Sequence, residues 1–216
     1  FVCKSALTQS LPTAVESKPY GDAGIDYNLS DNAGKKHGVW IRVYPDGSLY
    51  YVGAFNSGQP EGQFLYFFET GELMSKIEHP SVSHLTAQIS AIHYRTNSSV
   101  QSSGFYISVD DQEKPVKDGS WGYYDEGSKQ VKQETYSAGL LNGPYWIKTK
   151  EGILVEEGGF ANGKLDGLKT TYYDTGTVRQ RINYLADVLE GDFQVFYING
   201  MPKIEGNFIE GKEDLI

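Results

Sequence analysis

The stretch GPYWIKTKEGILVEEGGFANGKLDG, residues 143–167, contains the spacing that decides the fold. It opens and closes on glycines 24 residues apart, with another glycine nine residues in and aromatic rings at Tyr145 and Phe160. A unit of this length cannot bury a core alone, so the sequence predicts a repeat array in which neighbouring units pack on one another. The opening glycines of the clear units are Gly38, Gly62, Gly119, Gly143, Gly167 and Gly191.

Each unit, numbered from its opening glycine as offset 0, has aromatic residues at fixed positions. Offset +2 is Trp40, Phe64, Trp121, Tyr145 and Phe193, with Lys169 as the exception. Offset +17 is Phe55, Tyr136, Phe160, Tyr184 and Phe208, with His79 as the exception. Glycine stands at +9 in five units, one residue early at Gly127, and at +20 in four units, where one copy has Asp187 instead.

Two turns per unit predict one β-hairpin per unit. The dipeptides 46–47 and 199–200 are Asp-Gly and Asn-Gly, which accept positive φ at tight turns, and the flanking segments are rich in β-branched and aromatic residues. A second turn, offsets +18 to +24, joins one hairpin to the next. We expect an all-β, elongated, single-layer antiparallel meander of about seven 24-residue hairpins and about fourteen strands, running roughly 65 Å at ~4.8 Å per strand.

Symmetric pairing about the first turn sets offset +2 opposite +15. In three units the +15 residue is a glycine, and we expect the opposed ring to cover it. The predicted pairs are Trp40 with Gly53, Tyr145 with Gly158 and Phe193 with Gly206.

The interval from Gly62 to Gly119 is 57 residues, two units plus nine, which predicts a degenerate unit with insertions at about 80–118. Its origin is placed near Ile89. Residues 1–25 lack the pattern and contain two prolines, so they are expected to form an extended lead-in to an array over 26–216. Leu215 stands where the next glycine would fall, which predicts an end at a unit boundary. The chain does not begin with Met, which leaves open whether it is a processed or trimmed form.

The stretch Tyr51-x-Gly53-x-Phe55-x-x-Gly58-x-x-x-Gly62-x-Phe64 resembles the MORN (membrane occupation and recognition nexus) repeat. The longer unit, with its paired rings and Asn-Gly turn at 162–163, is similar to the bacterial variant of that repeat, whose members are labelled YwqK-type antitoxins. The resemblance covers residues 26–216. It implies a non-enzymatic binding or scaffolding role and brings no catalytic motif.

The charge balance limits the partners. With 19 basic and 28 acidic residues the formal net charge is −9, whereas phosphate backbones and anionic head groups reward clustered Lys and Arg. We therefore expect a protein partner, no nucleic acid, and no direct binding to anionic lipids. The single cysteine, Cys3, cannot form an intramolecular disulfide, and its position behind Phe1 and Val2 does not fit a lipid-anchored terminus.

No cofactor, metal ligand or catalytic residue is predicted, because each chemical motif fails on its context. Residues 158–164 approach a phosphate-binding loop, but Leu165 stands where Ser or Thr is needed and strands surround it. Residues 26–31 hint at calcium-loop spacing without the turn glycine and terminal Glu. The histidines lie in different units without the short spacing of metal ligands: His37, His79, His84 and His93.

Two carboxylate pairs invite an acid–base interpretation and fail on geometry. Glu156 and Glu157 are neighbours on a predicted strand, so their side chains point to opposite faces. Asp110 and Asp111 lie in the predicted insertion. An enzyme is not the expected class.

The remaining candidate is a sheet surface. Offsets +3 and +5 share the face opposite to +2 and also carry an apolar row, which is either covered by loops and long side chains or free to dock a protein. The sheet edges offer a second route, through strand addition. The predicted protein-binding residues are Phe67, Tyr124, Trp146, Tyr172 and Phe196.

The leading interpretation is a non-catalytic scaffold, an accessory subunit of a bacterial assembly, by preference in the cell envelope (periplasm or surface) and alternatively in the cytoplasm. The insertion around 107–118 is its predicted contact site. An antitoxin-like protein that neutralises a cognate toxin is one open alternative. The other is a glycan-binding or glycan-cleaving envelope protein, which would need aromatic platforms with carboxylates beside them.

Overall fold

The computed structural model describes residues 26–80, 87–107 and 114–214. Within them lie 18 strands and no helix. The strands are β1 (Leu29–Ser30), β2 (Lys36–Val43), β3 (Leu49–Asn56), β4 (Gln59–Phe67), β5 (Leu73–His79), β6 (Ile89–Tyr94), β7 (Val100–Ile107), β8 (Val116–Tyr124), β9 (Gln130–Ser137), β10 (Leu140–Leu141), β11 (Gly143–Lys148), β12 (Leu154–Ala161), β13 (Lys164–Leu165), β14 (Gly167–Tyr172), β15 (Val178–Leu185), β16 (Val188–Phe196), β17 (Pro202–Ile209) and β18 (Lys212–Asp214).

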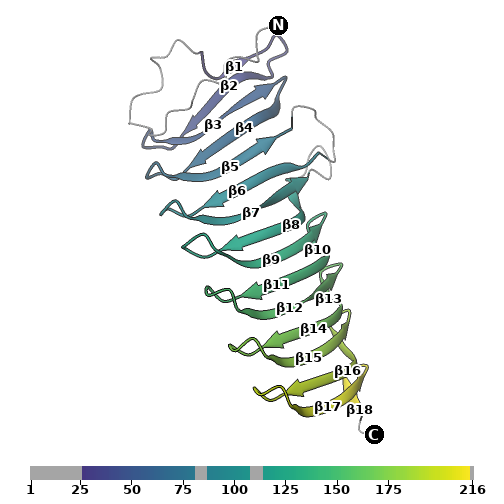
Figure 1. The fold of residues 1–216 in the computed structure, drawn as a ribbon. Helices are drawn as coiled ribbons and strands as arrows, with labels where there is room; N and C mark the ends of the chain where they lie inside the picture. Colours follow the sequence, from purple (N-terminus) through teal and green to yellow (C-terminus); the bar gives the residue numbers. More distant parts are fainter. Residues whose placement is uncertain (1–25, 81–86, 108–113, 215–216) are drawn as a thin grey trace.

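The strands form one open antiparallel sheet in meander order, a single elongated layer (Figure 1). Four of the 18 strands are short: β1, β10, β13 and β18. β1 and β18 lie at the two ends of the array. β10 and β11 pair with different parts of β9, and β13 and β14 pair with different parts of β12. The other 14 strands make seven hairpins, numbered here as units 1 to 7: β2–β3, β4–β5, β6–β7, β8–β9, β11–β12, β14–β15 and β16–β17. The predicted fold class is confirmed.

The register within the hairpins is also as predicted. Offset +2 pairs with +15 in the three glycine units, as Trp40 with Gly53, Tyr145 with Gly158 and Phe193 with Gly206. In the degenerate unit the corresponding pair is Ala91 with Gly104, which supports the origin at Ile89.

The turn inside each unit is a three-residue loop rather than a tight two-residue turn. In unit 1 the Tyr44 N–H donates to the Ser48 carbonyl, and the Gly47 N–H donates back to the Tyr44 carbonyl. Gly47 has φ 91°, while Asp46 is not among the residues of positive φ. Ser98 and Ser128 occupy the same +9 position with φ 63° and 60°, so the left-handed residue stays in register although Gly127 precedes it.

The two-residue turns lie between units. Asn162 and Gly163 both have positive φ, at 50° and 83°, which is the type I′ geometry that matches strand twist. The Gly163 N–H donates 2.7 Å to the carbonyl of Leu141 on β10, beside the tight turn one unit earlier, so consecutive tight turns are hydrogen-bonded into a column. The opposite edge is tied similarly, because the Tyr173 hydroxyl donates 2.8 Å to the carbonyl of Phe196 in the next unit.

The opening glycines introduce a bulge between units. Val52 pairs with Leu65 and Ala54 pairs with Glu61, so Gly53 faces the three residues 62–64. The degenerate unit opens on Ile89 instead, and its strand β6 pairs with β5 without a register shift. A β-branched residue does not adopt the positive φ that this bulge uses, which explains why the bulge is missing there.

Most of the core lies on one face of the sheet, in the column of +2 side chains. Phe64, Ala91, Trp121, Tyr145 and Phe193 are all buried, and Trp121 is 0% exposed. A single layer therefore packs its rings along its own surface, and the core continues from unit to unit.

The ring that covers a glycine comes from different places in the two halves of the array. A Cβ on Gly53 would strike the ring of Phe64 in the next unit, and one on Gly104 would lie 2.5 Å from Trp121 of the next unit. The expectation that Trp40 covers Gly53 is wrong, because the bulge swings Phe64 across the unit boundary. Trp40 instead donates its indole N–H to the Leu29 carbonyl.

In the C-terminal half the expectation holds. A Cβ on Gly158 would meet Tyr145 at 3.0 Å, and one on Gly206 would meet Phe193 at 2.5 Å. Each of these rings belongs to the same hairpin as its glycine.

Several predictions fall wholly or partly outside the described residues. These concern the lead-in 1–25, residues 81–86 and 108–113 of the degenerate stretch 80–118, and Leu215 at the predicted unit boundary. Residues 108–113 include Asp110, Asp111 and the centre of the predicted contact site.

Candidate functional site

The two faces of the sheet differ in what they expose. The packed face carries offsets +2, +4, +13, +15 and +17, and the open face carries +1, +3, +5, +14, +16 and +18, as the strand alternation and the register require. The packed face holds the buried +2 column. The open face is the candidate surface for a partner.

The structure places all five predicted binding residues on the open face. Phe67 is buried, at 8% exposed, and Tyr124, Trp146, Tyr172 and Phe196 are half-buried. They lie in five separate hairpins, so they form a spaced row and not a continuous aromatic strip. Whether this row binds protein stays a prediction.

Charged and polar side chains surround four of these rings. Lys148 Nζ lies 4.5 Å from the centre of the Trp146 ring, and the Arg181 guanidinium lies 5.5 Å from that of Phe196. The Tyr172 hydroxyl donates 2.5 Å to Glu157. Burial, followed by this hydrogen bond and the charge of Glu157, raises the pKa of Tyr172 to about 12. The hydroxyl of Tyr124 lies 3.0 Å from that of Ser103.

A row of directly opposed residues crosses the C-terminal strands on the open face. Their Cα positions are successive partners in the register from β11 to β17: Trp146, Glu157, Thr170, Arg181, Gln194 and Glu205. Glu157, Arg181 and Glu205 share offset +14 in units 5, 6 and 7, so charge alternates at one-unit spacing. The sequence reasoning missed this row, although opposite charges at one offset of consecutive units were visible there.

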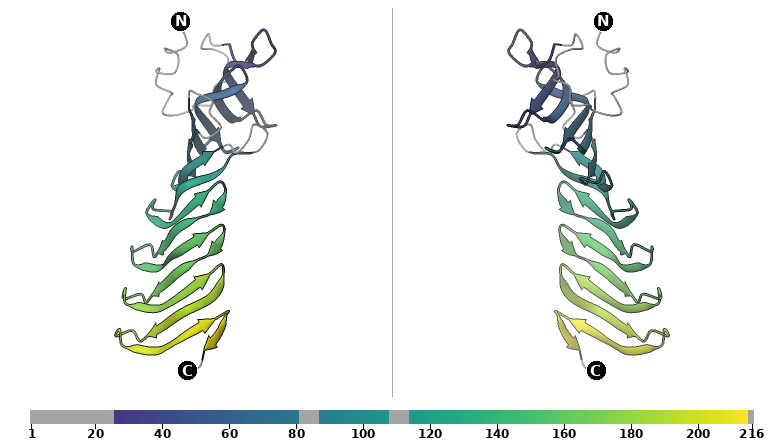
Figure 2. Two further views of the ribbon diagram at one scale, coloured as in Figure 1. Left: turned by 90° about the vertical axis from the view of Figure 1, so that its right-hand side faces the viewer. Right: turned by 90° about the vertical axis from the view of Figure 1, so that its left-hand side faces the viewer.

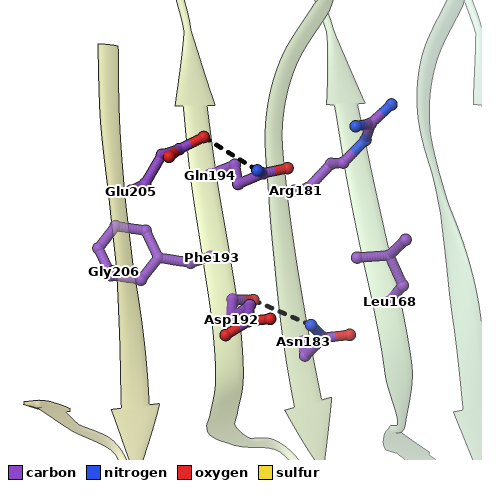
Figure 3. Close-up of a pocket in the computed structure, with 8 residues that line it drawn as sticks. All are labelled: Leu168, Arg181, Asn183, Asp192, Phe193, Gln194, Glu205 and Gly206. Atoms are coloured by element: carbon purple, nitrogen blue, oxygen red, sulfur yellow. Dashed lines mark hydrogen bonds between the residues drawn. The ribbon is translucent and has the colours of Figure 1, made fainter. Parts of the chain in front are cut away.

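A hollow of about 450 Å³ lies at the end of this row, between β14 and β17 (Figure 3). Its polar lining includes Arg181 and Glu205, which are exposed. Gln194 donates 3.0 Å to Glu205, and Asn183 donates 2.9 Å to the Asp192 carbonyl. Arg181 has no ion pair within the described part of the chain.

The apolar Leu168, which is 49% exposed, also lines the hollow. Three more exposed apolar side chains lie near the ends of β15, β16 and β17 at the tight turns: Leu185 (60%), Val188 (46%) and Ile209 (50%). Val188 also contacts the last tight turn, where a Cβ on Gly211 would lie 3.5 Å from it.

The packed face holds two polar clusters that the sequence reasoning also missed. In unit 4, Glu134 accepts from Tyr136 at 2.7 Å and pairs with Lys132 at 2.6 Å, while Lys117 donates 2.8 Å to Tyr123. Burial would raise the pKa of Glu134, but the hydrogen bonds from Lys132, Tyr136 and Tyr123 outweigh it and lower that pKa. We interpret this cluster as structural, because Glu134 fills the +15 position that is glycine in four of the other six units.

The second cluster surrounds His93. Its ring stacks on Trp121 at 6.0 Å, and its nitrogens lie 2.7 Å from the Ser75 hydroxyl and 3.2 Å from the Tyr106 hydroxyl. A Ser–His contact can activate a nucleophile, but Ser75 is only 8% exposed and beneath packed rings. Burial, and then the charge of Lys117, lower the pKa of His93.

The carboxylates of Glu156 and Glu157 have separate partners, on opposite faces of the sheet. Glu156 accepts from Tyr145 at 2.7 Å and pairs with Lys169 at 3.1 Å, whereas Glu157 accepts from Tyr172 on the other face. Other carboxylates cap the tight turns from the position before an opening glycine. Asp118, Asp166 and Glu190 accept the N–H of Ala138, Ala186 and Glu210 respectively.

The oxygens of the calcium-like segment bind their own backbone. Asn28 accepts from the Ile41 N–H, and Asp31 accepts from the N–H groups of Ala33 and Lys35. Across 26–80, 87–107 and 114–214, no group of three or more His, Cys, Asp or Glu could hold a metal ion. The same residues contain no helix long and apolar enough to cross a membrane.

Fold and surface together define a β-repeat protein that offers one open face. The family model described as the MORN repeat variant matches residues 165–186, which include all of β14 and β15. This match supports placing the chain in the MORN-repeat family, whose repeats are in general modules for protein and membrane interactions and are typically non-catalytic. No curated protein matches the chain.

Proposed function

We propose that this chain is a non-catalytic scaffold, an accessory subunit of a bacterial cell-envelope assembly, that binds a protein through the open face of its central units. The observation that carries the proposal is that the two faces of the sheet use their aromatic rings differently. The +2 rings fill the packed face, so the half-buried rings Tyr124, Trp146 and Tyr172 on the other face are not needed for the continuous core.

These rings suit a protein partner. A half-buried aromatic ring offers a large apolar surface at small conformational cost, and Tyr and Trp are enriched among the residues that dominate binding energy. Lys148 and Glu157 beside Trp146 and Tyr172 supply the charged surroundings typical of an interface rim. The net charge of −9 favours a partner with a basic contact surface over an anionic membrane.

The experiment is native co-purification followed by mass determination of the complex, for the natural chain and for Trp146→Ala. The matched control is Tyr197→Ala, which removes another ring, 50% exposed, at the turn of unit 7. We expect a stoichiometric companion that Trp146→Ala loses and Tyr197→Ala retains, with the β-sheet circular dichroism of both variants unchanged.

A companion that survives Trp146→Ala contradicts this use of the open face, and the absence of any companion contradicts the scaffold itself. A small companion that is toxic when expressed alone, and whose toxicity the chain relieves, would replace the scaffold with the antitoxin alternative.

A further inference from the structure

Units 6 and 7 carry matching positions on either side of β16 that differ in chemistry. On the open face, β15 carries Arg181, Asn183 and Leu185 at offsets +14, +16 and +18. The same offsets on β17 are occupied by Glu205, Asn207 and Ile209. Gln194 on β16 pairs in register with both Arg181 and Glu205, so the two strands lie at equal distances from β16. These six residues are the self-complementary patch.

The patch is complementary to its own image. A rotation by 180° about an axis parallel to β16, lying just above the open face, places β15 of one copy on β17 of another. Arg181 then meets Glu205, Asn183 meets Asn207, and Leu185 meets Ile209, and each pair occurs twice. This is the pattern of an isologous interface, in which one surface contacts itself.

The patch is also available. Leu185 and Ile209 are 60% and 50% exposed, Arg181 and Glu205 are exposed, and Arg181 lacks an ion pair within the described ranges. Val188 on β16, 46% exposed, would pack on its own copy beside the axis. The hollow between Arg181 and Glu205 leaves room for the opposing charged side chains.

We infer that a second copy of this chain docks on the self-complementary patch, giving a two-fold dimer held by paired Arg181–Glu205 contacts and by apolar contacts at the tight turns. This goes beyond the proposed binding of another protein, which uses the central units. One residue opposes it: the exposed Asp192 on β16 meets its own copy near the axis, and like charges at short distance disfavour association.

Charge reversal tests the inference on the purified full chain alone, by sedimentation velocity over a concentration series. We expect a concentration-dependent dimer, and a dissociation constant raised by about tenfold or more in either Arg181→Glu or Glu205→Arg. The double variant Arg181→Glu/Glu205→Arg recreates both ion pairs with the signs exchanged, so it should return to within about threefold of the natural chain. The control Lys150→Glu makes the same charge change in the exposed turn of unit 5 and should have no effect.

A second variant is expected to strengthen the dimer, so its effect cannot be attributed to misfolding. Asp192→Asn removes the repulsion at the axis and should tighten the dimer severalfold. A natural chain that stays monomeric up to ~0.2 mM overturns the inference, as does a folded double variant that remains as weak as the single ones. Because no other protein is present, failure here is distinguishable from failure of the proposed partner binding.

Discussion

The two ends of the array achieve similar burial in different ways. In units 1 and 2 the rings form one connected cluster, in which Phe64 contacts Tyr51, Phe55, Tyr66 and His79. In units 5 and 7 the packed-face rings each contact one other ring within the described residues, as Tyr145 with Phe160 and Phe193 with Phe208. On the packed face, the N-terminal rings therefore join one unit to the next, whereas the C-terminal rings stabilise single hairpins.

This difference bears on cooperativity. The stability of a repeat array is approximately a sum of terms within units and terms between neighbours. A ring that crosses a unit boundary contributes to the second term, and we expect the N-terminal half to unfold more cooperatively than the C-terminal half. Figure 2 shows the described strands continuing as one layer, so the units are joined along the array by contacts between neighbours.

The largest expected effect is that of Trp121→Ala. The ring is 0% exposed, covers Gly104 of the preceding unit, and donates 2.9 Å to the Phe105 carbonyl. Its loss should cost about 4 kcal/mol of unfolding free energy, measured by urea titration. Amide exchange should show lost protection in both β7 and β8. Phe193→Ala is the comparison, and its loss of protection should stay within β16 and β17; equal spread in both variants would refute the distinction.

Adding a methyl group to the covered glycines comes next in size. Gly53→Ala forces the buried Phe64 ring away across a unit boundary, which should cost about 2 kcal/mol. At Gly158 the nearest atom is 3.0 Å away on the Tyr145 ring, so Gly158→Ala should cost about 1 kcal/mol. Thermal melting of both variants measures the difference between the two stability losses. A larger loss in Gly158→Ala than in Gly53→Ala would mean that the Phe64 ring shifts more easily than its packing indicates.

Acid should loosen the N-terminal half first. Burial lowers the pKa of His79, and burial together with Lys117 lowers that of His93, from an ordinary value of 6.5. The folded state favours the neutral form of both imidazoles. Well above pH 6.5 the imidazoles are neutral in the folded and the unfolded chain, so they do not affect the free energy of unfolding. As the pH falls below 6.5 towards the lowered pKa values of the folded state, the unfolded chain takes up protons first and the free energy of unfolding declines. Amide exchange at pH 7.5 and 5 should show the loss in β5 to β7. His93→Gln should reduce this dependence, while a uniform loss over all units would point to another group.

The smallest effect is expected at Asp187, where φ is 75° and other units have glycine. Asp187→Gly relieves this strain but removes the 2.7 Å hydrogen bond from the Leu165 N–H to the carboxylate. The two changes have opposite effects on stability, so the free energy of unfolding should change by no more than about 0.5 kcal/mol. A loss above about 1.5 kcal/mol would show that the carboxylate, rather than the backbone, holds this turn.

The fold was largely predictable because repetition multiplies weak signals. A single Trp40–Gly53 pairing would be a guess, but the same +2 and +15 spacing in several units fixes the register, and it also locates the degenerate unit at Ile89. What the sequence could not supply is which ring covers which glycine. That depends on how the bulge at Gly62 places the ring of Phe64 over Gly53, across the unit boundary.

The candidate site was predictable only as a face. Alternation along strands correctly separated Glu156 from Glu157 and placed Trp146 and Tyr172 together. The exposure of Arg181 and Leu185, and the contact of Lys148 with Trp146, depend on side-chain packing between units. The self-complementary patch could not be predicted from the sequence. It depends on which residues of β15 in one copy face which residues of β17 in the other after a 180° rotation, and no sequence pattern contains this information.

The meander also determines how the molecule would respond to a pull along its long axis. The strands lie across that axis, so the hydrogen bonds between them point roughly along it (Figure 1). Force applied at the ends of the described array would load these bonds one pair at a time, as in opening a zipper, and not all together as in shear. The array should therefore extend stepwise at low force, hairpin by hairpin. The C-terminal units, whose packed-face rings stay within their own hairpins, should open first, so the chain would act as a compliant spacer.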